Sequence, residues 1–143
     1  MKTSCSSAIE LPTIEECREE ATKISDELLR MCMLRQCQDI EITCSEWSRL
    51  ECKEQTPPGG TLLAFTVMQY HGTLHSFYPV KETHWCEISS SHECIVKAVV
   101  HEVAHSCGWD HRQGKSVPGD DPERQPLPEC QCVDERGVRK PCK

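Results

Sequence analysis

Twelve cysteines in 143 residues constrain this chain more than any other feature, because cross-links can replace part of a hydrophobic core. Their even number and wide spread predict up to six disulfides, whereas the alternative is a reduced protein with several buried thiols. No Cys-x-x-Cys pair occurs, which argues against a zinc ribbon, a RING-like site or a thioredoxin-like redox pair. Disulfides in turn predict a secreted or otherwise extracytoplasmic, oxidising location. The cysteines lie at positions 5, 17, 32, 37, 44, 52, 86, 94, 107, 130, 132 and 142.

Length and composition predict a single domain over 1–143 with a thin core, since only 37% of the residues are hydrophobic and 5% aromatic. The formal charge of −7 argues against a nucleic-acid partner, because phosphate binding needs a basic surface. No run approaches the roughly 20 apolar residues of a membrane span, so we expect no membrane insertion. The first 17 residues lack the apolar stretch of a signal peptide.

The first part of the chain is predicted to be helical. Apolar residues recur at three- and four-residue steps across 13–37, which predicts one amphipathic helix, capped by Thr13, that covers a core. A short coiled coil is the alternative. Four cysteines between positions 32 and 52 predict that this region is cross-linked to itself or to the first helix. The apolar stripe comprises Ile14, Cys17, Ala21, Ile24, Leu28 and Met31.

The middle of the chain favours strands around one further helix. "DIEIT" favours a short strand, and "SEWSRLECKEQ" favours a helix with Ser45 at its cap, before a break at 56–60. Residues 61–70 form the most strand-like run, "HG" at 71–72 predicts a turn, and 73–80 alternates as a second strand. A third strand is expected within 83–88. These segments predict a small antiparallel sheet.

The segment "SSSHECIVKAVVHEVAHSCG" predicts a second long helix, because a serine can cap its start and Gly108 can end it. Ile95, Val99, Val103 and Cys107 form its apolar stripe. Residues 112–143 contain five prolines and little periodicity, which predicts an irregular tail tied down by its three cysteines. We therefore expect an α+β domain in which 1–111 form the helices and sheet.

Three histidines and a carboxylate cluster at the end of this second helix. On a helix, positions i and i+4 project side by side, so His101 and His105 can present two imidazoles to one metal ion. Glu102 can serve as general base toward a metal-activated water, and Gly108 permits a sharp turn that returns His111 to the same ion. Three neutral imidazoles with an open fourth position are a catalytic zinc arrangement. The alternatives are a structural zinc site and a helix whose histidines bind nothing.

The run His101-Glu102-x-x-His105-x-x-Gly108-x-x-His111 resembles the extended zinc-binding signature of the metzincin metallopeptidases. The resemblance implies a zincin-like fold with an N-terminal helix, a small mixed sheet, an active-site helix and a substrate extended along an edge strand. It also implies Zn²⁺ as cofactor, the three histidines as its ligands, and Glu102 as the catalytic base.

The chain departs from the metzincin pattern in two places. The family carries a methionine turn downstream of the motif, whereas Met68 is the last methionine here, so another residue must lie beneath the site. No tyrosine follows the motif, so the oxyanion would be stabilised by zinc itself or by an upstream group or arginine. The candidates are Tyr70, Tyr78, His84 and Arg112.

Residues around the motif leave further alternatives. Asp110 could replace His111 as third ligand or orient an imidazole, and we favour His111 on the position of the match. Cys107 is expected to form a disulfide with Cys130 or Cys132 in the tail, and a thiolate that inhibits the zinc is the alternative. Trp109 is expected to pack as a hydrophobic anchor. The other histidines, at 71, 75, 84 and 92, are expected to be surface or hydrogen-bonded residues.

These observations predict a zinc-dependent endopeptidase whose partners are a protein or peptide substrate. Its small, cross-linked form is similar to the metallopeptidase toxin domains of bacterial secreted effectors, which implies a possible immunity or inhibitor protein as a second partner. A stand-alone secreted peptidase is the alternative. The contrasting hypothesis is a non-catalytic, disulfide-rich binding module with a structural zinc, against which the intact Glu102 argues.

Overall fold

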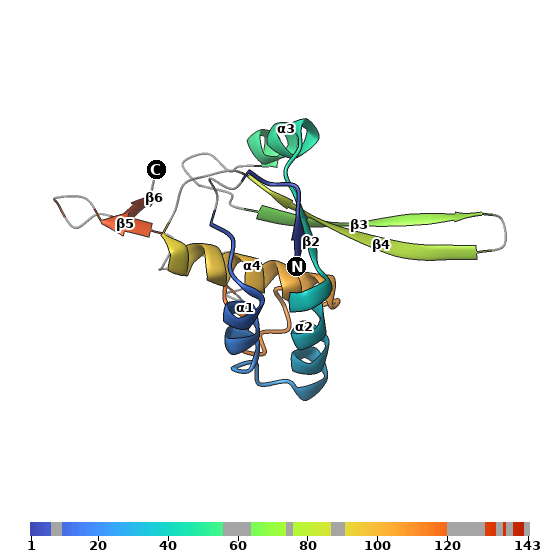
Figure 1. The fold of residues 1–143 in the computed structure, drawn as a ribbon, viewed down its shortest axis with the longest axis horizontal. Helices are drawn as coiled ribbons and strands as arrows, with labels where there is room; N and C mark the ends of the chain where they lie inside the picture. The colour runs from blue at the N-terminus through green and yellow to red at the C-terminus, as the bar shows by residue number, and fades with distance from the viewer. Residues whose placement is uncertain are drawn as a thin grey trace.

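The computed structural model describes residues 1–6, 10–55, 64–73, 76–86, 91–119, 131–133, 136 and 139–141. Within these residues the chain forms a mixed α/β structure with a small mixed sheet (Figure 1). Helix α3 (Glu46–Gln55) lies against one face of the sheet, and α4 (His92–Ser106) crosses the other (Figure 1). Helices α1 and α2 lie on the far side of α4 (Figure 1). The predicted order of helix, strands and motif helix is confirmed.

The first helical region is two helices, α1 (Ile14–Ala21) and α2 (Glu27–Asp39), so the prediction of one helix across 13–37 is wrong. A capping box begins α1, in which Thr13 and Glu16 each accept the other's backbone N–H at 3.1 Å. Asp26 begins α2 by accepting the N–H of Leu29 at 2.9 Å. This new start rotates α2, so Leu28 and Met31, expected to be buried, are 80% and 57% exposed. The buried residues of α2 are Leu29, Met33 and Cys37.

The sheet has the strand order β1-β2-β4-β3. Strands β1 (Lys2–Thr3), β2 (Glu41–Thr43) and β4 (Ser76–Trp85) run parallel, and β3 (Ala64–Thr73) pairs antiparallel with β4 at one edge. The sheet is therefore mixed, and the antiparallel sheet expected from the strand pattern is wrong because only β3 and β4 pair antiparallel in it. In Figure 1 the β3–β4 hairpin extends well beyond the helices.

Two details of the predicted hairpin are wrong. The turn expected at 71–72 is strand, because His71 pairs with Tyr78 and Gly72 with Phe77 in an unbroken register. The separate strand expected within 83–88 is the end of β4, which reaches Trp85. The strand at "DIEIT" and the helix capped by Ser45 are confirmed, and the Ser45 hydroxyl accepts the N–H of Ser48 at 3.0 Å.

The main core lies between α4, the sheet and the first two helices. Val99, Val100 and Val103 of α4 are at most 1% exposed, and Trp85 at the end of β4 is fully buried. Ile95 is buried as well, which confirms three positions of the predicted stripe, while Cys107 is half-buried. A smaller cluster of Cys52, Phe65 and Cys86 lies near α3. The core fixes α4 firmly beneath the sheet.

Four disulfides join elements that are distant in the sequence. They are Cys5–Cys44, Cys17–Cys37, Cys32–Cys107 and Cys52–Cys86, and Cys94 is also disulfide-bonded. Cys107 bonds to α2, so the predicted bond from Cys107 to the tail is wrong. Of the four cysteines between positions 32 and 52, only Cys37 is cross-linked to α1. The others bond to the N-terminal segment and to the residues that directly follow β4 and α4. Disulfides of this kind fit an oxidising extracellular environment.

The tail is not wholly irregular, because β5 (Gln131–Val133) pairs antiparallel with β6 (Arg139–Pro141). Cys130 and Cys142 lie outside the described residues, as does the side chain of Cys132, so the expectation that these cysteines tie the tail down stays a prediction. Among the described helices, none is long and apolar enough to cross a membrane.

Candidate metal centre

Helix α4 and the turn that follows it carry all the residues of the motif. Ser91 begins the helix by accepting the N–H of Cys94 at 3.2 Å, as the sequence predicts. The helix ends at Ser106, and Gly108 adopts a φ of 89°, which a residue without a β-carbon adopts at little cost. Trp109 is then buried and its indole N–H donates to the Gly114 carbonyl at 2.9 Å. The turn is thus anchored as expected, and it brings His111 back toward α4.

The three predicted histidines lie together. The Nε2 atoms of His101 and His105 are 3.1 Å apart, and the His111 ring centroid lies 4.8 Å from that of His101 and 5.0 Å from that of His105. The ligand atoms that the three side chains offer all lie within 4.8 Å of one another, so this group could hold a metal ion. In the described part of the chain, no other cluster of histidine, cysteine and carboxylate groups has this property.

Backbone carbonyls fix the tautomers of two of these imidazoles. His101 Nδ1 lies 2.6 Å from the Pro118 carbonyl, and His105 Nδ1 lies 2.9 Å from the Trp109 carbonyl. A carbonyl only accepts, so each Nδ1 carries the proton and donates it. In a neutral imidazole the Nε2 atom then presents a lone pair.

The two facing Nε2 atoms therefore repel unless a cation lies between them. Two nitrogens bound to one tetrahedral zinc at 2.0–2.1 Å would be about 3.3 Å apart, close to the spacing seen here. In addition, His111 Nδ1 is buried and has no hydrogen-bond partner within the described part of the structure. These residues fit a metal ion by donor type, spacing and unsatisfied polar atoms.

The electrostatics favour neutral imidazoles. Burial lowers the pKa of His101 to about 4, and the neighbouring histidines act in the same direction, while the hydrogen bond to Pro118 opposes the shift. Burial also lowers the pKa of His105, against the raising effect of its bond to Trp109. At neutral pH both rings are therefore uncharged before any metal arrives, so protons do not compete for the Nε2 atoms.

Glu102 lies in the same helix but points into the interior. Its side chain is 6% exposed, and its Oε2 accepts a hydrogen bond from the hydroxyl of Thr66 on β3. Burial raises the pKa of Glu102 to about 7, and the bond from Thr66 opposes that rise. A carboxylate with a pKa near neutrality can both take and return a proton, which suits acid–base chemistry.

A left-handed segment after the motif leads to the residue that contacts the first of the three histidines. Gly114, Lys115 and Ser116 have φ values of 65°, 63° and 62°, and Val117 beyond them is 2% exposed. Ser116 Oγ accepts the backbone N–H of Ser25 at 2.7 Å, which ties this segment to the α1–α2 connection. Pro118 then offers its carbonyl to His101. The expectation that a residue other than methionine lies beneath the site therefore has one candidate group in the described residues, the Pro118 carbonyl beside His101.

Other predicted candidates lie apart from this cluster. Asp110 is exposed and accepts the N–H of Arg112 at 2.8 Å, and neither belongs to the metal-binding group. His84 is buried on the α3 face of the sheet, where its Nδ1 lies 2.7 Å from the Ser48 hydroxyl. That bond matches the expectation of a hydrogen-bonded histidine, and the ring packs against Trp47 and Phe65 on the face of the sheet opposite α4, away from the histidine cluster. The side chains of Tyr70 and Tyr78, and those at 71 and 75, lie outside the described residues.

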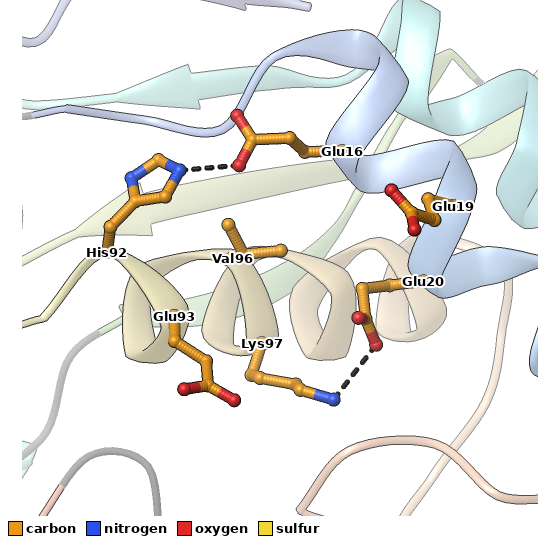
Figure 2. A pocket seen from close by; sticks show the side chains of 7 residues that line it. All are labelled: Glu16, Glu19, Glu20, His92, Glu93, Val96 and Lys97. Carbon is orange, nitrogen blue, oxygen red and sulfur yellow. Dashed lines mark hydrogen bonds and ion pairs between the residues drawn. The ribbon is translucent and has the colours of Figure 1, made fainter.

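A groove of about 250 Å³ between α1 and α4 is separate from the histidine cluster (Figure 2). His92 Nε2 lies 2.5 Å from a Glu16 carboxylate oxygen, and Lys97 Nζ lies 2.9 Å from one of Glu20 (Figure 2). These pairs join the two helices across the groove. His92 is thus an exposed, hydrogen-bonded residue, as expected for a histidine outside the motif.

Sequence reasoning missed the groups that support the motif. Pro118 and Trp109 act through backbone carbonyls, which leave no mark in the sequence, and the contact of Thr66 with Glu102 depends on strand register. The alternating pattern of β3 was the one available signal, because it places Thr66 and Phe65 on opposite faces.

Comparisons of the chain with protein-family models, curated proteins and solved structures find no match.

Proposed function

We propose that this protein is a zinc-dependent endopeptidase of the metzincin type, with a zincin-like fold. The observation that carries the proposal is the pair of imidazole Nε2 atoms that face each other 3.1 Å apart, with both Nδ1 atoms committed to carbonyls and His111 beside them. A cluster built to hold a structural ion normally closes all four positions with protein ligands, whereas the described residues supply three here. The open position and the adjacent glutamate favour hydrolysis.

His101, His105 and His111 would hold the zinc ion. When bound, zinc acts as a Lewis acid that supplies an activated water and polarises the scissile carbonyl. Glu102 would take the proton from the attacking water through a carboxylate oxygen and return it to the leaving amine. Its buried position keeps the carboxylate away from bulk solvent, which strengthens its interaction with a nearby proton donor.

Strand β3 is the natural element to hold a substrate, because it lies at the edge of the sheet next to α4. An extended peptide could add to this edge through backbone hydrogen bonds. The substrate would therefore be an unfolded or locally extended polypeptide. The disulfides fit action outside the reducing cytoplasm, either as a secreted peptidase or as a toxin domain with an immunity protein as partner.

The test is cleavage of an unfractionated mixture of unfolded proteins by the oxidised, zinc-loaded protein, followed by sequencing of the new termini. Glu102→Ala is the matched control, since it is expected to keep zinc and to lose turnover. His105→Ala is expected to lose both. New termini produced equally by wild type and Glu102→Ala would overturn the mechanism.

The same experiment addresses the non-catalytic alternative. A wild-type protein that binds one zinc ion and yields no new termini would favour a disulfide-rich binding module with a structural metal. The metal content of the two variants, measured on the same preparations, keeps a lack of turnover distinct from a lack of zinc.

A further inference from the structure

Two threonines on neighbouring strands lie directly opposite each other on the face of the sheet that α4 covers. Thr66 of β3 and Thr83 of β4 are register partners, and their hydroxyl oxygens are 3.1 Å apart. The adjacent residues, Phe65 before Thr66 and His84 after Thr83, are also register partners, and their rings stack on the opposite face near α3. The alternation of a strand therefore directs the two threonines toward α4.

The Thr66 hydroxyl also donates to Oε2 of Glu102, and this fixes the direction of the hydrogen bonds. A hydroxyl has one proton to give, so when Thr66 donates to the carboxylate it must accept from Thr83. The result is a directed chain from Thr83 through Thr66 to Glu102. Thr83 is 3% exposed, so water does not readily replace it as the donor.

Within the described residues, the hydroxyl of Thr66 is the hydrogen-bond partner of the Glu102 side chain. Glu102 is 6% exposed, and nearby positions of α4 carry the buried apolar residues Val99, Val103 and Ala104. A buried carboxylate is costly unless it is hydrogen-bonded. The bond from Thr66 holds Oε2 and leaves Oε1 as the second acceptor of the carboxylate.

We propose that Thr66 is a positioning residue for Glu102: the Thr83–Thr66 chain holds the carboxylate in one orientation, with Oε1 available to the reacting proton. This inference rests on the proposed function for its catalytic consequence. The orientation itself is a property of the metal-free protein. A catalytic base must be held within a narrow range of geometry, and a displacement of about 1 Å can lower turnover by about 100-fold.

The experiment compares Thr66→Val, which keeps the shape and removes the hydroxyl, with Thr66→Ser, which keeps the hydroxyl. Thr43→Val is the matched control, since Thr43 is a half-buried strand residue that pairs with His84 and so lies on the α3 side of the sheet. The first readout is the set of three-bond couplings of the Glu102 side chain by NMR in zinc-free protein. The others are the Kd for zinc, and kcat and KM on a cleaved peptide.

We expect wild type, Thr66→Ser and Thr43→Val to show one Glu102 rotamer, and Thr66→Val to show averaged couplings. Thr66→Val should lower kcat by about 10- to 100-fold, with KM and the Kd for zinc within about twofold, and Thr66→Ser should recover most of kcat. A single Glu102 rotamer in Thr66→Val would overturn the proposal, as would an unchanged kcat. If the wild type cleaves nothing, the proposed function fails, while the couplings still decide whether Thr66 positions Glu102.

Discussion

Replacing Cys32 and Cys107 by alanine removes the disulfide that joins α2 to the residue directly after α4. We expect two separate effects. The first is a loss of global stability, because the disulfide closes a long loop in the unfolded chain. The second is a loss of metal affinity, because Cys107 immediately precedes the Gly108 turn that returns His111 to the other two histidines.

The size of the stability loss follows from chain entropy. The two cysteines are 75 residues apart, and the Cys52–Cys86 disulfide bypasses 34 of these, which leaves a loop of about 41 residues and a loss of about 4 kcal/mol in the free energy of unfolding. Cys5–Cys44 is the matched control. Its separation of 39 residues is shortened by the 20 of Cys17–Cys37 to about 19, which gives a loss of about 3 kcal/mol.

The assay is urea unfolding of both double-alanine variants under oxidising conditions, with a chelator present so that bound metal does not add to stability. Zinc affinity is then measured separately by competition with a chromophoric chelator. We expect both variants to lose stability, whereas only Cys32→Ala/Cys107→Ala should lose zinc affinity, by tenfold or more. Equal zinc affinity in the two variants would refute the local argument, and a stability loss below about 1 kcal/mol would refute the entropic one.

Three further predictions test the core, a helix start and the metal centre. Met33→Ala should lower the free energy of unfolding by about 2–5 kcal/mol, because Met33 is fully buried. Met31→Ala should change it by less than about 0.5 kcal/mol, because Met31 is 57% exposed. Similar urea midpoints for the two variants would contradict the orientation of α2 seen in the structure. The N–H of Leu29 donates to Asp26 and lowers the pKa of that carboxyl, so the ionised carboxylate should stabilise the fold above the unfolded pKa of 3.8. This stabilisation should be lost as the pH falls through the lower pKa of the folded protein. Asp26→Asn should flatten this part of the curve of Tm against pH, and an unchanged curve would contradict the cap. Zinc at 100 times its Kd should raise the free energy of unfolding by about 2.7 kcal/mol, and chelation should reverse the gain. His101→Ala should show no such gain, and an equal gain would place the metal elsewhere.

The motif helix could be predicted from sequence because its signals are local and agree with one another. A serine cap, an apolar stripe of three- and four-residue steps and a glycine stop all lie within about 20 residues, and each is a property of neighbouring residues. The association of the three histidines followed from the same local geometry. In contrast, the single helix over 13–37 was wrong although its stripe was regular, because Asp26 restarts the helix after a turn that leaves the spacing nearly intact. Asp26, a preferred N-cap residue followed by the acidic Glu27, was the sequence signal that a second helix begins there.

The parts that could not be predicted depend on contacts between distant segments. The partner of Cys107 is Cys32 and not a cysteine of the tail, because α2 packs beside α4 and the two thiols meet there. Spacing in the sequence carries no information on that packing. The same limit applies to the support of the candidate centre. His101 is oriented by the Pro118 carbonyl, which the contact of Ser116 with Ser25 holds near the first two helices, and Glu102 is oriented from β3. The motif thus specifies which groups meet, whereas the disulfides and the sheet register decide how firmly each is held. Variants of Thr66 should therefore alter turnover and variants of Ser116 should alter metal affinity, although every residue of the motif from His101 to His111 is unchanged.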